Sequence, residues 1–240
     1  YKRQVLDRPN PLGGKRVEGC LVEDGFISFV SQYKIPYIYG LTCGELAEML
    51  NGERMLGNGV KCDLKVIKMR GWKRKMNYTA TGLQWIPSSP HIPHAETSYF
   101  YPASGILGEF SYMSIGVGYP IPFEMFAAPW MDAGRLAQRL NSLKVPGVIF
   151  RPIYAKPFYA AFKGENIEGV QLHITNYDKA PLTDIQFLVM QEVAAMYPDK
   201  AVFDAADPKR FSMFDNVCGT SKIRGLFGKR NRWEDAKGYW

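Results

Sequence analysis

The apolar and polar positions in the first part of the chain predict a strand, a helix and a second strand. Residues 4–7 are typical of a short buried strand, and residues 64–69 predict another. Between them, Thr42 is placed to cap a helix over residues 44–55, because Glu45 follows three positions later, as in a capping box. Apolar side chains recur three and four positions apart in that helix, which gives it one buried face. This order of elements predicts a parallel sheet with right-handed crossovers, as in open α/β proteins.

Two other stretches of the chain predict little regular structure. Residues 35–39 indicate a short extended piece. Residues 83–102 combine prolines and histidines with many aromatic side chains, a composition that opposes regular structure yet is too apolar for a solvated linker. We therefore expect an ordered, partly buried loop over residues 83–102.

The rest of the chain predicts a second part of mixed α+β structure. Asp132 is a suitable N-cap for a helix that carries three leucines on one face. The predicted elements are an extended region over 104–118, helices over 132–143 and 184–196, and strands over 148–154 and 170–175. The change of pattern places a domain boundary near residue 80, which divides the chain into residues 1–80 and residues 81–240.

Composition indicates a folded protein and leaves its partner open. Of the 240 residues, 46% are hydrophobic and 22% are charged, which supplies enough apolar surface to exclude intrinsic disorder. The 30 basic residues exceed the 23 acidic ones, and the net charge of +7 suits cell-wall polymers, nucleic acid or lipid headgroups without selecting one. No run approaches the roughly 18 consecutive apolar residues that a membrane-spanning helix needs.

Several reaction classes lack their sequence motifs. The chain has no phosphate-binding loop, no HExxH zinc motif, no dinucleotide-binding glycine motif and no nucleophile elbow. Four cysteines, Cys20, Cys43, Cys62 and Cys218, are scattered without zinc or redox spacing, so we expect core positions, with a disulfide as the alternative. We therefore predict no metal and no cofactor.

A first candidate ligand-binding loop follows the first predicted strand. Asp7, Arg8 and Asn10 place a carboxylate, a guanidinium and a carboxamide on a proline-stiffened turn. Open α/β sheets present ligand-contacting groups at this end of their strands. The structural alternative is that Asp7 and Arg8 only brace the loop.

Two later loops add polar and acidic side chains. Residues 85–94 combine an aromatic platform with polar groups such as His91, as a polyhydroxylated ligand requires, although the prolines alone would make a structural strap. Glu109 and Glu124 are candidate acids or bases, because glycosidases use two carboxyl groups about 5 to 9 Å apart, one of them kept protonated by apolar surroundings. Glu109 has apolar neighbours and is the better candidate for a raised pKa, and a surface carboxylate is the alternative.

The basic residues near the C-terminus favour a solvated, amphipathic segment over a nucleic-acid site. They are interleaved with aromatic residues, but Glu234 and Asp235 interrupt them and no nucleic-acid signature accompanies them. The basic residues of this segment are Lys222, Arg224, Lys229, Arg230 and Arg232. We expect no nucleic-acid partner.

Taken in order, the loops resemble one protein family. The first motif, residues 5–14 with the sequence Val-Leu-Asp-Arg-Pro-Asn-Pro-Leu-Gly-Gly, is highly specific. Weaker motifs follow over nearly the whole chain at Tyr39–Thr42, Gly44–Ala47, Trp85 with Pro90, Tyr101–Pro102, Ser114 with Gly116 and Gly118, Pro122–Glu124 and Ala128–Trp130. Together they resemble the NamZ-like exo-β-N-acetylmuramidases, long catalogued as a domain of unknown function.

The resemblance implies an enzyme of the bacterial cell envelope, periplasmic or extracellular. It would release terminal N-acetylmuramic acid from the non-reducing end of peptidoglycan-derived saccharides. Residues 1–80 would be the C-terminal part of a Rossmann-like α/β domain, and residues 81–240 a smaller mixed α+β domain, with the site between them. The favoured catalytic glutamate of the family lies in a Pro-Glu-His-Gly segment that precedes these motifs. Because the chain opens on Tyr1 without that segment, we expect further polypeptide upstream.

The resemblance also implies roles for the candidate residues and doubts about the substrate. Glu109 would be the acid/base group or a group that supports it. The implied sugar ligands are Asp7, Arg8, Asn10, His91 and Glu124. The family pattern has asparagine where this chain has Tyr112 and His91, and an arginine that could pair with the lactyl carboxylate of muramic acid where this chain has Val117. A non-catalytic glycan-binding or scaffolding relative is therefore the alternative function.

Overall fold

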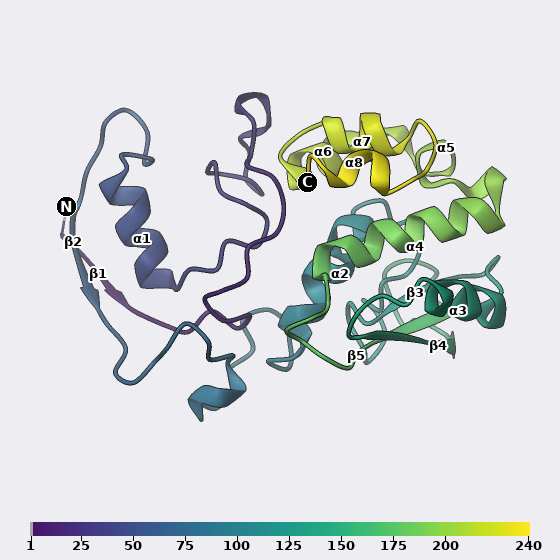
Figure 1. Ribbon diagram of the computed structural model, residues 1–240, viewed down its shortest axis with the longest axis horizontal. Helices are drawn as coiled ribbons and strands as arrows, with labels where there is room; N and C mark the ends of the chain where they lie inside the picture. Colours follow the sequence, from purple (N-terminus) through teal and green to yellow (C-terminus); the bar gives the residue numbers. More distant parts are fainter. Residues whose placement is uncertain (1) are drawn as a thin grey trace.

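A computed structural model describes residues 2–240. The strands and α-helices are β1 (Lys2–Leu6), α1 (Cys43–Gly52), β2 (Asp63–Ile67), α2 (Thr97–Gly108), β3 (Met125–Ala128), α3 (Ala133–Ser142), β4 (Val148–Ala155), β5 (Ile167–Ile174), α4 (Leu182–Met196), α5 (Val202–Ala205), α6 (Phe211–Cys218), α7 (Lys222–Phe227) and α8 (Glu234–Lys237). β1, β2 and α1 lie at one end of the long axis, the elements from β3 onward lie toward the other, and long loops run between them (Figure 1).

The N-terminal part has the predicted order of strand, helix and parallel strand. β1 and β2 pair in parallel, from Lys2 opposite Asp63 to Leu6 opposite Ile67. The capping box of α1 is present, since the Thr42 hydroxyl accepts the Glu45 N–H and the Glu45 carboxylate accepts the Thr42 N–H. The sequence-based prediction of an α/β arrangement is confirmed here.

The predictions for the irregular stretches are confirmed only in part. Residues 35–39 form no strand; Ile38 makes a single bridge to Glu18. Pro36 has no N–H to contribute to a ladder, which limits pairing there. The predicted loop over residues 83–102 is irregular as far as Glu96, where it leads into α2.

The prediction of an extended region over residues 104–118 is wrong, because α2 occupies the first part of this range. Nine of the twelve residues of α2 are buried, so the helix shows no polar face in the sequence, and Pro102 within it is a residue that usually ends helices. Gln186 of α4 makes two hydrogen bonds to the backbone of α2. Its amide donates to the Pro102 carbonyl at 2.9 Å and accepts the Leu107 N–H at 3.0 Å.

The second part is built on a three-stranded antiparallel sheet in the order β3-β5-β4. The predicted strands and helices are present within a few residues of their expected ends. Asp132 caps α3 by accepting the Arg135 N–H, as expected. α3 packs on β4 and β5, while α4 packs on α2 and α3, so the main core lies among these helices and the sheet.

The basic C-terminal segment is amphipathic, and its apolar face forms part of this core. Trp233 is 2% exposed and stacks on Phe187 of α4, with ring centroids 4.1 Å apart. Phe227 is also fully buried. Three of the basic side chains form ion pairs, namely Lys222 with Glu23, Arg224 with Asp215 and Arg230 with Asp235.

Two charged side chains of the N-terminal part hold the start of α4. Arg16 donates to the carbonyls of Ala180 and Tyr177. The Glu18 carboxylate accepts the Thr183 N–H at 2.9 Å and the Thr183 hydroxyl at 2.8 Å. α4 has no side-chain cap at Pro181, so Glu18 supplies the helix cap from the other half of the chain.

Glu23 makes a further connection between the two parts, and it predicts a pH dependence of stability. Its carboxylate accepts hydrogen bonds from Lys222, Tyr239 and Thr220 at 2.5 to 2.7 Å, which lowers its pKa from 4.5 to about 2. Because the folded-state pKa is depressed, this contribution is full above pH 4.5 and is lost as the pH falls toward 2.

Thermal unfolding between pH 5 and pH 2.5 should therefore show a smaller loss of stability in Glu23→Gln than in the unmodified protein. The same pH titration on Asp24→Asn, an exposed neighbour, should resemble the unmodified protein. Parallel curves for Glu23→Gln and the unmodified protein would exclude the proposed contribution of Glu23.

The structure tests two further predictions, which concern the state of the cysteines and a membrane-spanning helix. All four cysteines are free; Cys218 is buried as expected, whereas Cys43 is exposed at the start of α1. No disulfide therefore forms among residues 2–240. Within the same range, no helix has the length and apolarity needed to cross a membrane.

Candidate functional site

A cavity of about 430 Å³ lies between the N-terminal loops and the helices α2 and α6. The loop after β1 contributes Asn10, and the loop before α1 contributes residues 30–33 and 35–39. Ser88 comes from the proline-rich strap, and Tyr101 comes from α2. The volume is typical of a site for a small ligand.

Tyrosines give this cavity both aromatic surface and hydroxyl donors. Burial raises the pKa of Tyr37 and of Tyr101, so both phenols stay protonated at neutral pH. The Tyr37 hydroxyl is buried, and hydrogen bonding between the Tyr37 and Tyr101 side chains contributes to the pKa shifts of both. Tyrosine hydroxyls can bond a polar ligand, and their rings provide flat apolar surface beside it.

Glu109 lies on the same side of α2 as Tyr101. The two residues are eight positions apart with Gly105 between them, and a Cβ atom at Gly105 would lie 3.1 Å from the Tyr101 ring. The charge of Glu109 adds to the rise in the pKa of both Tyr37 and Tyr101. Burial raises the pKa of Glu109 itself, against the opposing charge of Arg210. Glu109 is thus a carboxyl group that keeps its proton to a higher pH than usual, near the tyrosines that line the cavity.

Asp7 braces the N-terminal part of the fold. Its buried carboxylate accepts the Gly44 N–H at 2.7 Å, the Thr42 hydroxyl at 3.1 Å and the Arg8 N–H at 2.9 Å. A carboxylate at the start of a helix is favoured by the helix dipole. Asp7 therefore ties the end of β1 to the start of α1, and its guanidinium neighbour Arg8 donates to the Asp7 carbonyl at 3.0 Å.

Asn10 has both a structural position and access to the cavity. Its amide donates to the Leu41 carbonyl at 3.0 Å and its side-chain oxygen accepts the Leu12 N–H at 2.9 Å, which fixes the turn after β1. Asn10 also lines the cavity of about 430 Å³.

His91 and Glu124 are not among the residues that line the cavity of about 430 Å³. The Nε2 atom of His91 lies 3.0 Å from the Tyr159 hydroxyl, and the two rings stack. Glu124 precedes β3, where burial raises its pKa, and hydrogen bonding to Gln171 and the charge of His94 oppose the rise.

The structure therefore brings only part of the predicted site together. Asn10, Ser88 of the proline-rich loop and Tyr101 share one cavity, and Glu109 follows directly after the end of α2 without lining that cavity. Asp7 and Arg8 line a different cavity of about 420 Å³. No cavity found among residues 2–240 contains Asp7, His91 and Glu109 together, and the binding and catalytic roles of the candidate residues stay predictions. The sequence analysis did not predict the tyrosines as site residues, although Tyr39 and Tyr101 lie in family motifs and tyrosines are dense over residues 33–39.

These features define a two-part α/β protein with a cavity of about 430 Å³, lined by tyrosines and polar side chains, between its N-terminal loops and the helices α2 and α6. Comparison with protein families identifies the family to which this chain belongs. The N-terminal domain of exo-β-N-acetylmuramidase NamZ matches residues 2–96, and the C-terminal domain of the same protein matches residues 99–240. The chain belongs to the NamZ family, as the sequence motifs indicated. The two matches meet at the start of α2, and the boundary near residue 80 stays a prediction.

A curated relative is the peptidoglycan β-N-acetylmuramidase NamZ of Bacillus subtilis (strain 168). It is 38% identical to this chain over 220 residues, which cover 92% of this chain and 51% of the relative. The chain thus spans about half the length of the curated relative that it matches.

Two crystal structures of DUF1343 family proteins from Bacteroides fragilis are similar to this one. The first is 65% identical, with a TM-score of 0.97, over 99% of this chain and 61% of the other. The second has a TM-score of 0.74 at 24% identity over the same shares of the two chains, and it shows likeness of fold alone. The predicted fold class is confirmed by the first of these structures.

Proposed function

We propose that this chain is part of a peptidoglycan glycosidase that releases terminal N-acetylmuramic acid from the non-reducing end of peptidoglycan-derived saccharides. The match of both NamZ domains, in order and over nearly the whole chain, carries this proposal. The relative from Bacillus subtilis is named as an enzyme of this kind, which favours catalysis over the alternative of a non-catalytic glycan-binding protein.

The cavity chemistry supports a saccharide substrate. Tyr37 and Tyr101 supply protonated hydroxyls and ring surface, and Asn10 also lines the same cavity. In the proposed reaction Glu109 either donates a proton to the glycosidic oxygen or supports the group that does so. The family resemblance places the favoured catalytic glutamate in a Pro-Glu-His-Gly segment, which residues 1–240 do not contain.

Val117 bears on how the substrate is held. Its side chain is partly buried and packs against the main core, between Gly116 and Gly118. Valine cannot pair with a carboxylate, so in the proposed enzyme the lactyl group of muramic acid has no guanidinium partner at this position. The proposed location is the periplasm or the extracellular side of the cell envelope, where peptidoglycan lies.

The test is hydrolysis of an aryl β-N-acetylmuramide by the purified full-length protein. We expect the aryl group to be released together with free N-acetylmuramic acid, and much less release from the matching N-acetylglucosaminide. Saturable binding of muropeptide sugars by calorimetry, without any turnover, would contradict the proposal and favour the glycan-binding alternative.

A further inference from the structure

A second and larger cavity, of about 880 Å³, lies at one end of the three-stranded sheet. The paired residues Tyr154 and Glu168, at the end of β4 and the start of β5, form part of its lining. The rest of the lining comes from residues 155–158, from residues 163, 164, 166 and 167, and from Tyr119 and Pro129. This cavity shares no lining residue with the cavity of about 430 Å³ between the two parts of the chain.

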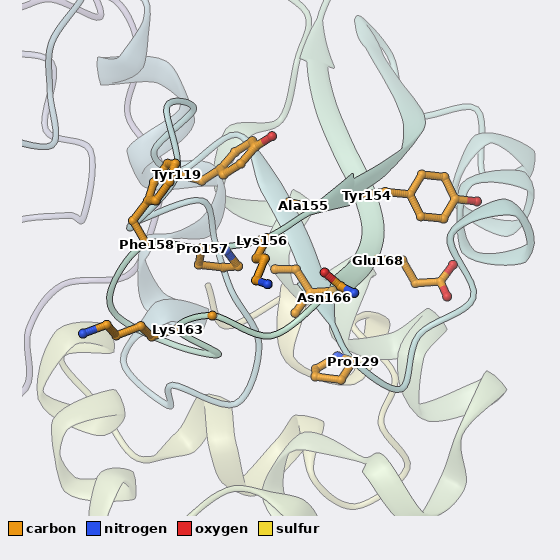
Figure 2. Close-up of a pocket in the computed structure, with 12 residues that line it drawn as sticks. Tyr119, Pro129, Tyr154, Ala155, Lys156, Pro157, Phe158, Lys163, Asn166 and Glu168 are labelled. Atoms are coloured by element: carbon orange, nitrogen blue, oxygen red, sulfur yellow. The ribbon is translucent and has the colours of Figure 1, made fainter.

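Aromatic side chains dominate the open surface of this second cavity. Phe158 is 71% exposed and Tyr154 is 69% exposed, which is unusual for rings of this size. The rings of Tyr119 and Phe158 are nearly parallel, with an interplanar angle of 17° and centroids 6.5 Å apart. Figure 2 shows these two rings on one side of the cavity and Tyr154 on the other, with Lys156 and Asn166 between them. The arrangement leaves ring surface accessible to a flat ligand such as a sugar.

The charge in this cavity favours an anionic ligand. Lys156 and Lys163 line it, both are exposed, and neither forms an ion pair within residues 2–240. Glu168 is the acidic residue of the lining, and its carboxylate accepts the Ala133 N–H at the start of α3. Figure 2 shows Lys156 in the middle of the cavity and Lys163 extending outward at its edge. The Lys156 ammonium group is therefore available to a carboxylate inside the cavity, Lys163 adds positive charge at its edge, and the Asn166 amide can bond an acetamido or peptide group.

The loop that carries these side chains is held in a fixed shape. Phe158 donates its N–H to the Gly118 carbonyl at 2.8 Å, and a Cβ atom at Gly118 would lie 2.0 Å from the Tyr159 carbonyl oxygen. Ala160 and Phe162 have φ angles of 63° and 59°, a left-handed conformation that costs energy for residues other than glycine. A strained loop held by close backbone contact is typical of a preformed binding site.

We propose that this cavity binds a peptide-bearing muramic acid unit, with the sugar ring against Tyr119 and Phe158, a carboxylate of the peptide at Lys156, and Lys163 adding positive charge at the edge of the cavity. The proposal rests on the proposed function for its choice of a peptidoglycan ligand. Aromatic surface, two unpaired cations and an amide together match a carboxylated amino sugar better than a neutral glycan.

The test uses N-acetylmuramoyl-L-alanyl-D-isoglutamine, which has no glycosidic bond and stays intact whether or not the protein is a glycosidase. With the full-length protein, saturating ligand should slow acetylation of Lys156 and Lys163 about fivefold, as measured by mass spectrometry. Lys179, an exposed lysine beyond the opposite end of β5, provides the control and should react at an unchanged rate.

Variants give a second measurement of the same contacts. The double variant Lys156→Gln/Lys163→Gln should bind the muramyl peptide about tenfold more weakly, as two partly exposed charge contacts predict, whereas Lys179→Gln should bind normally. Lack of protection at Lys156 and Lys163, or equal protection by a neutral N-acetylglucosamine oligosaccharide, would overturn the proposal. A protein that shows this protection but cleaves no muramide would retain the binding site and lose only the proposed function.

Discussion

The variant Glu109→Gln of the full-length protein should release N-acetylmuramic acid at least about a hundredfold more slowly than the unmodified enzyme, the size expected for loss of an acid/base group. Glutamine keeps the shape of the side chain and cannot donate or accept the proton. Burial raises the pKa of Glu109, so as a proton donor it would set the pH above which the rate declines. The measurement is the pH dependence of kcat/KM for an aryl β-N-acetylmuramide.

The exposed residue Glu53 at the end of α1 provides a matched control, because Glu53→Gln removes a carboxylate far from the cavity. This control should keep the rate and the pH profile of the unmodified protein. The Glu109→Gln profile should in contrast lose its alkaline decline. A wild-type rate in Glu109→Gln would remove Glu109 from the mechanism.

The second large effect is expected from Trp233→Ala, which should lower the free energy of unfolding by about 3 to 5 kcal/mol. Trp233 is among the largest fully buried side chains, and its ring lies 4.1 Å from that of Phe187 at an angle of 5°. Alanine would leave a cavity between α4 and the C-terminal segment. Urea unfolding followed by circular dichroism measures the change.

Phe29→Ala is the appropriate comparison, because Phe29 is 89% exposed and its removal should alter stability by no more than about 0.5 kcal/mol. A loss of less than about 1 kcal/mol in Trp233→Ala would mean that the C-terminal segment is not an integral part of the core. That result would restore the simpler expectation of a solvated tail.

The elements that sequence predicted well are those with local signals. The capping box at Thr42 and the N-cap at Asp132 fix helix starts within a few residues, and both are present in the structure. α2 was missed because its signals are not local. It is buried on nearly all sides and contains Pro102, and part of its backbone hydrogen bonds to Gln186, a residue of another helix. No periodicity within α2 itself could reveal that contact.

In the candidate site, too, the features set by neighbouring residues were predictable from the sequence, whereas those set by packing between distant residues were not. The turn at Asn10 follows from its own residues, and the structure places it at a cavity. Which loops share that cavity depends on how the two parts of the chain pack. Asp7 illustrates the difficulty, because a carboxylate on a turn suggests a ligand contact, whereas the folded chain uses it to join β1 to α1.

Glu18 caps α4, and this contact joins the two segments that match the two NamZ domains. Residues 2–96 supply the carboxylate and residues 99–240 supply its partner Thr183, so neither segment is chemically self-sufficient at that point. Recombination that exchanged one segment between homologues would have to preserve both residues or leave a helix start uncapped. The two segments are therefore expected to evolve as a single unit.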